Sequence, residues 1–334
     1  MNRYKCLQQF LNLHFNNEPY TLSLITGDAS FRRYYRVSCE AKNYIVMDSD
    51  PQVVNNTPYV ELNHAFSKHG FILPKIINLD AQQGFFILND LGNIHLADLL
   101  QDTERKAYYQ QLISLSSEWA KVPATEHMKD YDAEFIQFEL NIFIEWLVEG
   151  VLQQPLDARL KTLWQTSCAV LVDNFLMQPK VTVHRDFHSR NIMRSDKQWA
   201  IIDYQDAVTG PVCYDLVSLL RDCYFKLPED ELDSLLNYAF TEFSKQGLIK
   251  KNDYAQFTRW FDLTGIQRHL KAAGIFCRLN LRDGKSGYVK NILPTLNYVV
   301  EIAKKYNELN ELGHWVEFDV IPAMTHAINE HLGD

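Results

Sequence analysis

The sequence predicts an α+β protein whose strands lie before residue 90 and whose helices lie mostly after it. Short runs rich in β-branched and aromatic residues are typical of strands, and they occur at 21–26, 34–38, 43–48, 75–79 and 84–88. Beyond residue 90 the apolar residues recur at helical spacing, with proline or glycine between many of the segments. We therefore expect two domains, a small strand-rich lobe over 1–90 and a large helical lobe over 91–334.

The length and composition are typical of a soluble globular protein. The chain of 334 residues can bury a large core, and 46% of the residues are hydrophobic while 22% are charged. The net charge of −9 argues against a nucleic-acid partner, which usually requires a broad basic surface. No apolar run approaches the length of a membrane span, and the first residues lack the apolar stretch of a signal peptide. We expect a cytoplasmic protein without a membrane partner.

The cysteines carry no signal of a metal site. They are scattered along the chain without a C-x-x-C pair: Cys6, Cys39, Cys168, Cys213, Cys223 and Cys277. This spacing predicts neither a zinc site nor a dense disulfide framework. Free thiols in a reducing compartment are therefore expected.

The first lobe contains two expected helices and two informative loops. Residues 3–13 place their apolar side chains on one stripe, and 57–69 fits a helix with Thr57 at its N-cap. Between the first two strands lies the sequence Gly27, Asp28, Ala29, Ser30. This stretch is either a hairpin turn or a loop whose backbone N–H groups cover phosphates, and the motif described below favours the loop.

The fifth strand ends in the sequence Asn-Asp-Leu-Gly at 89–92, which we interpret as the linker between the lobes. Backbone groups exposed at Asn89 and Leu91 suit the edge of an adenine ring. After this linker the helical lobe is expected to contain helices at 95–100, 103–121, 133–149, 156–177, 214–225, 229–246, 254–280 and 288–309.

The catalytic signal lies within residues 181–203. A β-branched run leads to His184-Arg185-Asp186, Asn191 follows five residues after the aspartate, and an apolar strand ends at Asp203. Phosphoryl transfer needs a carboxylate to accept the proton of the attacking hydroxyl, and amide and carboxylate oxygens to hold magnesium on nucleotide phosphates. The pattern H-R-D-x-x-x-x-N followed by an acid at a strand end supplies these groups in order.

Each of these residues alone has a structural explanation, so the prediction rests on their combination. His184 alone would be interpreted as a core histidine, and Asp203 alone as a turn former at a strand end. Together they predict a kinase-type site for phosphate transfer.

Several stretches resemble the aminoglycoside phosphotransferase and choline kinase-like superfamily. They lie at 26–37, 184–193, 202–208, 267–271 and 281–285. Within that superfamily they are most similar to bacterial anomeric sugar kinases of cell-wall recycling, which phosphorylate the C1 hydroxyl of N-acetylmuramate and N-acetylglucosamine. The resemblance implies a two-lobed protein-kinase-like fold, with ATP and Mg²⁺ as cofactors and an amino sugar as acceptor.

The resemblance also implies roles for individual residues. Asp186 corresponds to the catalytic base, and Asn191 and Asp203 correspond to the magnesium ligands. Asp215 corresponds to a buried acid that braces the catalytic loop by hydrogen bonds, and we expect His184 to support this loop as well.

One feature departs from the superfamily pattern. Its third strand carries a lysine that grips phosphate, but residues 44–48 read Tyr-Ile-Val-Met-Asp here, with Lys42 only at the start of that strand. An arginine can replace that lysine, because a guanidinium holds phosphate oxygens in a bidentate fork. Alternation puts Arg32 and Arg33 on opposite faces of the sheet, so only one can point into the cleft. We favour Arg33, which shares its parity with Val37, and we expect Val37 to cover the adenine.

A basic stripe is a candidate for the acceptor site. Residues at three- and four-residue spacing share one face of the predicted helix: Arg268, Lys271, Ile275, Arg278 and Arg282. This stripe is either a solvated face or part of the acceptor site, where the lactyl carboxylate of N-acetylmuramate would pair with a cation. His188 and Arg190, inside the catalytic loop, are further candidates for contact with the acceptor or the phosphates.

We therefore predict an ATP- and Mg²⁺-dependent small-molecule kinase, most similar to the sugar 1-kinases. An aminoglycoside or choline-type amino-alcohol kinase is an alternative, since acids of the large lobe could form an acidic acceptor pocket: Asp132, Glu134, Glu139 and Glu145. The missing lysine leaves open a non-catalytic nucleotide-binding module. A protein kinase is disfavoured, because no Ala-Pro-Glu motif follows Asp203.

Overall fold

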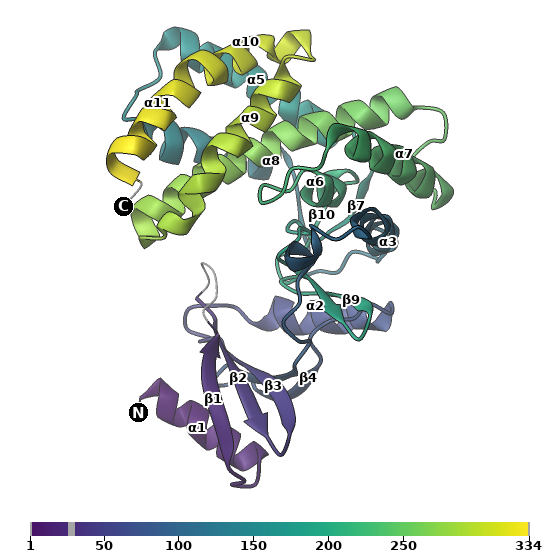
Figure 1. Cartoon of the computed structure of the whole chain (residues 1–334), viewed down its shortest axis with the longest axis vertical. Coiled ribbons are helices and arrows are strands. Elements are labelled where there is room, and N and C mark those ends of the chain that lie inside the picture. Colours follow the sequence, from purple (N-terminus) through teal and green to yellow (C-terminus); the bar gives the residue numbers. More distant parts are fainter. Residues whose placement is uncertain (1, 26–30, 333–334) are drawn as a thin grey trace. The chain divides into compact units, whose positions relative to one another are not determined.

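The computed structural model describes residues 2–25 and 31–332, and they form an α+β protein, as predicted (Figure 1). Two compact units are present. The first comprises Met1–Asp98 with Arg190–Asp206, and the second comprises Leu99–Ser189 with Ala207–Asp334.

The division of the chain differs from the boundary expected at residue 90. A hairpin of β8 (Ile192–Ser195) and β9 (Gln198–Ile201) belongs to the first unit, although it lies far along the sequence. Backbone hydrogen bonds explain this placement, because the amide of Arg194 donates to Ile94 and the amide of Ile201 donates to Ile72. The first unit therefore contains the last part of the catalytic loop as well as the N-terminal sheet.

The sheet of the first unit is antiparallel and has the strand order β1-β2-β3-β5-β4. Its strands are β1 (Tyr20–Ile25), β2 (Arg33–Cys39), β3 (Lys42–Asp48), β4 (Ile76–Asp80) and β5 (Phe85–Asn89). Helix α1 (Arg3–His14) covers one face, since its Leu7 and Leu11 are fully buried against Val37 and Val46. The strands lie close to their predicted positions because each carries a run of β-formers ended by turn residues.

Helix α2 (Thr57–Lys68) begins with Thr57 inside the helix, so the expected N-cap is shifted by one residue to Asn56. The side chain of Asn56 makes no capping bond because it is held elsewhere: its amide donates to the Ser49 carbonyl, and its oxygen accepts from the Ser49 hydroxyl. Pro58 lies in the first turn, as expected.

The second unit is mostly helical. Its longer elements are α3 (Arg105–Trp119), α4 (Ala133–Ile142), the π-helical η2 (Phe143–Val151), α5 (Ala158–Leu176), α6 (Tyr214–Leu220), α7 (Glu229–Lys245), α8 (Tyr254–Asp283) and α9 (Ile292–Ala303). A small sheet of β6 (Lys129–Asp130), β10 (Val208–Pro211) and β7 (Lys180–Val183) leads into the catalytic loop. No described helix is both long and apolar enough to cross a membrane.

The sequence analysis missed the last helices of the second unit. The chain continues after residue 309 through α10 (Asn310–Trp315) and α11 (Ile321–Ala327), with π-helical turns at Val316–Val320 and Ile328–Leu332. The predicted helix at 288–309 is in fact α9 flanked by 3₁₀ turns, Ser286–Asn291 before it and Asn307–Leu309 after it. Val316 and Val320 are buried in the main core, so burial of an apolar face explains why this short-helix segment folds.

Helix α8 is the central element of the second unit and packs against α4, α5, α6, α9 and η2 (Figure 1). It approaches the junction of α4 and η2 closely at Gly274, where a β-carbon would lie 2.5 Å from the carbonyl oxygen of Ile142. This glycine therefore permits a backbone approach that no larger residue allows.

Gly274→Ala is expected to lower the free energy of unfolding by about 1–3 kcal/mol, because the added methyl group forces the two helices apart. Alanine has the better intrinsic helix propensity, so a loss would be due to the close contact. Chemical denaturation measures the change, with Gly287→Ala as the control, because a β-carbon there meets nothing within 4 Å. Equal stability of Gly274→Ala and the wild type would contradict the close approach.

Candidate active site

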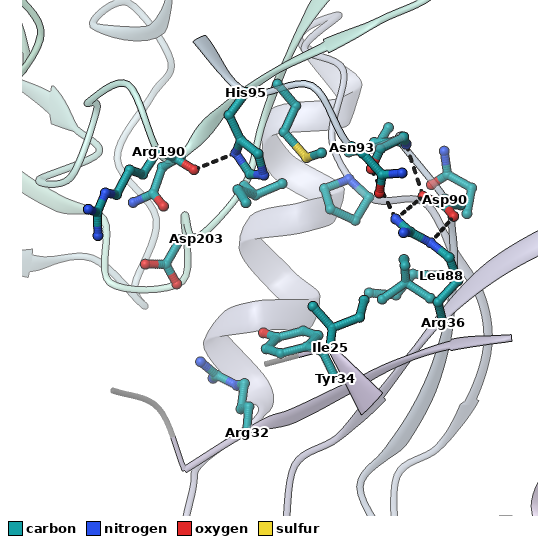
Figure 2. Close-up of a pocket in the computed structure, with 18 of the residues that line it drawn as sticks. Ile25, Arg32, Tyr34, Arg36, Leu88, Asp90, Asn93, His95, Arg190 and Asp203 are labelled. Atoms are coloured by element: carbon teal, nitrogen blue, oxygen red, sulfur yellow. Dashed lines mark hydrogen bonds and ion pairs between the residues drawn. The ribbon is translucent and has the colours of Figure 1, made fainter. Parts of the chain in front are cut away.

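The first unit contains a cavity of about 650 Å³ beside the sheet (Figure 2). Its walls come from the strands, the linker and the β8–β9 hairpin, and they include Arg32, Tyr34, Arg36, Ile45, Tyr59, Leu88, Asn89, Leu91, Arg190, Asn191, Ile202 and Asp203. Apolar side chains and a few polar groups line the same space, which is typical of a small-molecule site. Asn89 and Leu91 lie where the sequence analysis expected a nucleotide contact. Gly27, Asp28, Ala29 and Ser30 lie outside the described residues.

The expected parity of β2 is wrong. Arg32, Tyr34 and Arg36 line the cavity, whereas Val37 is fully buried on the other face, in the core with α1. Arg33 shares the parity of Val37 and is exposed at the start of the strand. The helix decides between the faces, because α1 covers the side that carries Val37 and leaves the opposite side open. Val37 therefore does not cover a ligand in this cavity, and Arg33 does not point into it.

Arg32 and Asp203 lie at the same end of this cavity (Figure 2). The guanidinium carbon of Arg32 lies 5.7 Å from the ring centroid of Tyr59, a cation–π distance. Burial raises the pKa of the Tyr34 hydroxyl, and the neighbouring Tyr59 and Asp203 raise it further, so this hydroxyl remains a hydrogen-bond donor. The end of the cavity near Asp203 thus combines a cation and a neutral donor with an acid.

The other end of the cavity is fixed by an ion pair between a strand and the linker (Figure 2). Arg36 contacts Asp90 through two nitrogens, at 2.6 and 3.1 Å, and donates to the carbonyl of Gly92 at 3.1 Å. Asp90 also accepts from the amide of Gly92 at 2.9 Å. This bidentate ion pair fixes the conformation of the linker, which forms one edge of the cavity.

Asn191 and Asp203 both line the first cavity, at the start of β8 and just after β9. A backbone bond from the amide of Ile202 to the carbonyl of Asn191, 3.0 Å long, holds these two positions together. Asp203 has a left-handed backbone with φ of 65°, which aspartate tolerates better than most residues. No group of three or more potential metal-binding side chains occurs among the described residues. One amide and one carboxylate nevertheless fit Mg²⁺, which takes most of its remaining oxygens from phosphates and water.

The second unit contains a smaller cavity of about 110 Å³. It is lined by two residues of the catalytic loop, Asp186 and His188, and by Asp222, Tyr224, Arg268, Lys271, Ile275 and Phe276, among others. The structure thus places His188 at this cavity and Arg190 at the first one. His188 packs edge-on against Tyr224, with ring centroids 5.5 Å apart.

Two acids hold the catalytic loop at its two ends. Asp215 accepts the backbone N–H groups of His184 at 2.7 Å and Arg185 at 3.0 Å, and burial raises its pKa to about 7. Asp222 accepts the backbone N–H of Ser189 at 3.0 Å and its hydroxyl at 2.5 Å. The position of Asp215 matches its expected role as a brace.

Between these ends, Arg185 has a left-handed φ of 79°, a conformation that a non-glycine residue adopts at a cost. His184 is buried beside Trp119, and its Nδ1 accepts the backbone N–H of Asp186 at 3.2 Å. Hydrogen bonds on both sides of Arg185 therefore keep this loop conformation, which aims Asp186 into the cavity.

Glu139 balances two cations beneath the second cavity. The carboxylate lies 2.7 Å from Lys271 and 2.7 Å from Arg185, and it also accepts the hydroxyl of Tyr131. Burial would raise the pKa of Glu139, but Lys271 and Arg185 lower it to about 2, so the group is ionised. The sequence analysis had counted Glu139 among the acids of a possible acidic acceptor pocket. Its charge is instead balanced inside the protein by Lys271 and Arg185.

The other three acids of that set also fail to form an acidic pocket. Asp132 caps α4 by accepting the amide of Phe135, while Glu134 and Glu145 are exposed. None of the three lines the second cavity.

The basic stripe of α8 divides into two parts. Arg268 and Lys271 line the second cavity with Ile275, as part of the stripe was expected to do. Arg278 is half-buried but does not line it, and Arg282 is exposed and pairs with Asp283 at 2.8 Å. The expectation for Arg278 is therefore corrected: the stripe turns away from the cavity after Phe276.

Asp186 is ionised although it is half-buried. Burial alone would raise its pKa, but the charges of Lys271, His188 and Arg268 together lower the pKa below the ordinary range. An ionised carboxylate here accepts a hydrogen bond from a hydroxyl group and fixes its orientation.

Asp222 and the pairing of Glu139 were missed by the sequence analysis. Asp222 follows Asp215 by seven residues but lies after the end of α6 at Leu220, so helical spacing did not predict its contact with Ser189. Glu139 gave no local signal, since its partners lie 46 and 132 positions away, at Arg185 and Lys271.

Three features together define a kinase-fold phosphotransferase. They are an antiparallel sheet in one unit, a helical second unit, and an H-R-D loop followed in order by an amide and a carboxylate. The chain belongs to the phosphotransferase enzyme family, whose sequence pattern matches residues 21–248. The family and the enzyme class predicted from the motifs are therefore confirmed, and the alternative of a non-catalytic module is set aside.

Proteins of similar sequence include sugar kinases. The N-acetylmuramate/N-acetylglucosamine kinase of Neisseria meningitidis is 36% identical over 318 residues, which cover 93% of this chain and 94% of that protein. The protein of the same name from Pseudomonas putida is 32% identical over 296 residues, which cover 89% of this chain and 87% of that protein.

Similar solved structures include kinases of amino alcohols. An ethanolamine kinase of Plasmodium vivax has a TM-score of 0.67 at 11% identity, covering 91% of this chain and 90% of that one. A choline kinase of Streptococcus pneumoniae has a TM-score of 0.63 at 12% identity, covering 88% of this chain and 99% of that one. At these identities the likeness shows the fold alone, and it confirms the kinase-like architecture.

Glu139→Gln is expected to lower the free energy of unfolding by about 3–5 kcal/mol at neutral pH, because it leaves two buried cations without a counter-charge. The pKa of Glu139 is lowered from 4.5 to about 2 in the folded protein, so its stabilising effect is complete above pH 4.5 and fades as the pH falls towards 2. Denaturation of both proteins at several pH values should therefore show a difference that shrinks below pH 4.5. The exposed Glu145→Gln serves as the control, and a constant difference across this range would contradict the assignment.

Proposed function

We propose that the protein transfers the γ-phosphate of ATP to the anomeric hydroxyl of N-acetylmuramate or N-acetylglucosamine. The observation that carries the proposal is the Asp186 carboxylate, which is half-buried yet ionised and lines a cavity with two cations. The names of the similar kinases support the amino-sugar acceptor, since they match nearly the whole chain. The free thiols of all six cysteines support a reducing, cytoplasmic setting.

Asp186 would accept a hydrogen bond from the acceptor hydroxyl and align its oxygen with the γ-phosphorus. As the bond from this oxygen to phosphorus forms, the bond from the γ-phosphorus to the bridging oxygen breaks, ADP leaves, and the proton passes to Asp186. The pKa of Asp186 is low, so it is a weak base early in the reaction. This suits a loose transition state, in which positioning and charge matter more than early proton removal.

Asn191 and Asp203 are the residues that would hold Mg²⁺, which when bound offsets the negative charge of the phosphates. Arg32, at the same end of the first cavity, would hold phosphate oxygens in place of the missing lysine. Ile45 and Leu88 offer apolar surface for the adenine, and Asn89 and Leu91 would contact its edge. We retain Gly27, Asp28, Ala29 and Ser30 as proposed phosphate contacts, on the sequence argument alone.

The charge of the second cavity argues against a cationic acceptor such as choline. Arg268 and Lys271 line it, and the carboxylate of Asp222 is occupied by the amide and hydroxyl of Ser189. A cationic alcohol would have only the Asp186 carboxylate as a partner there and would approach the positive charge of Arg268, which disfavours it in a partly buried site.

Asp186→Asn should lower kcat by roughly 10²–10⁴-fold, the usual effect of losing a general base. The affinity for Mg-ATP should change little, since Asn191 and Asp203 are retained. ADP release would be measured with both amino sugars, choline and an aminoglycoside, and phosphorus NMR would locate the transferred phosphate. Asp196→Asn, in the exposed turn of the β8–β9 hairpin, is the matched control. Wild-type turnover with choline alone would refute the proposed acceptor, and an active Asp186→Asn would refute the proposed base.

Arg32→Ala and Arg33→Ala form a second test, since the two residues are neighbours in sequence but not in the cavity. Loss of Arg32 should raise the KM for ATP and lower kcat/KM about ten- to hundredfold, because it removes a hydrogen bond between charged partners. Arg33→Ala should stay close to the wild type, since its side chain is exposed. Steady-state kinetics with varied ATP measure both effects. A larger effect of Arg33→Ala would mean that the phosphate-binding arginine lies on the other face of the sheet.

A further inference from the structure

The two cations of the second cavity differ in whether an acid forms an ion pair with them. Lys271 lies 2.7 Å from the carboxylate of Glu139, so its charge is matched. Arg268 donates to the carbonyl of Arg185 at 2.7 Å, and its guanidinium lies 4.7 Å from the ring centroid of Tyr214. Among the residues that the structure describes, no acid forms an ion pair with Arg268, and the charge that favours its ionised form is that of Asp186, which lines the same cavity.

This arrangement leaves Arg268 able to bind an anion. A guanidinium has five N–H donors in a planar fork, and one carbonyl and one ring face use only part of that capacity. Cations withdrawn from water are usually paired, since an unpaired buried charge is costly. An anionic ligand would therefore gain more at Arg268 than at Lys271, which already has a counter-ion.

The size and walls of the cavity indicate what carries the anion. A volume of about 110 Å³ is well below the ≈ 300–1,000 Å³ of whole ligand pockets, so this cavity encloses only the part of a ligand that lies between Asp186 and Arg268. Asp186 lines the same cavity and marks the position of the reacting hydroxyl. Ala272, Ile275 and Phe276 provide apolar surface beside Arg268. The matching group is a short carboxylate side arm with an apolar carbon, close to the reacting hydroxyl.

We propose that Arg268 binds the lactyl carboxylate of N-acetylmuramate and so determines the preference for this acid over neutral N-acetylglucosamine. This inference rests on the proposed function. The two sugars share the C1 hydroxyl, so Asp186 treats them alike, and they differ at C3, where only N-acetylmuramate carries the lactyl ether. Arg278 and Arg282 lie on the same helix but do not line the cavity. Discrimination is therefore assigned to one residue of the stripe.

The test compares kcat/KM for the two sugars in wild type and in Arg268→Gln. The ratio of N-acetylmuramate to N-acetylglucosamine should fall about ten- to hundredfold, the range expected for a lost hydrogen bond to a charged group. Arg268→Gln also removes the hydrogen bond to the carbonyl of Arg185. A resulting change in the loop would alter kcat/KM for both sugars by the same factor, so the ratio would not change. Arg268→Lys should restore part of the preference, because it restores the charge without the fork.

Two controls isolate the carboxylate. Arg282→Gln changes a cation of the same helix outside the cavity, and it should leave the ratio unchanged. The carboxamide of N-acetylmuramate removes the charge from the sugar instead of the protein. Wild type should prefer the acid to this amide, whereas Arg268→Gln should treat the two compounds nearly alike.

The inference is overturned if Arg268→Gln keeps the wild-type ratio, or if it lowers turnover of both sugars equally, since Arg268 would then act on the phosphoryl group or the loop. Calorimetric binding of both sugars without ATP separates this failure from that of the proposed function. If wild type turns over neither sugar, the proposed function fails. In that case the carboxylate site is supported if wild type binds N-acetylmuramate more tightly than N-acetylglucosamine and Arg268→Gln does not. It is refuted if wild type binds both sugars equally well.

Discussion

Glu139 is a single buried carboxylate shared by two cations, and the acceptor half of the site depends on it. It joins α4 to α8 through Lys271 and to the catalytic loop through Arg185. Without this carboxylate two positive charges would remain buried side by side, a costly arrangement. With it, Lys271 is held where its charge lowers the pKa of Asp186. The ionised state of the proposed base is thus a consequence of helix packing.

Backbone hydrogen bonds to acids complete this arrangement. Asp215 and Asp222 each accept donors of the catalytic loop, so the strained conformation at Arg185 is maintained from both ends. Carboxylates suit this task because each offers two acceptor oxygens to orphan N–H groups. The chain leaves the second unit after Ser189 and continues in the first.

The charged side chains around the second cavity bear on which kind of acceptor the proposed site would bind. Kinases of ethanolamine and choline share this architecture, yet a cavity with Arg268 and Lys271 suits a neutral or acidic alcohol better than a cation. Side chains of α8 would therefore set the electrostatic character of the proposed acceptor site.

The sequence by itself determined the strands of the N-terminal sheet, most helices and the order of Asp186, Asn191 and Asp203, because these depend on periodicity and spacing within short segments. It did not determine which face of β2 lines the first cavity, since the packing of α1 decides that Val37 is core and Arg32 is not. It also could not place the β8–β9 hairpin with the first unit. Most of all, it could not separate Arg268 from Lys271. They share one stripe in sequence, but the tertiary structure brings Glu139 to Lys271 and gives Arg268 no ion pair among the described residues, because a counter-ion is a contact made across more than a hundred residues.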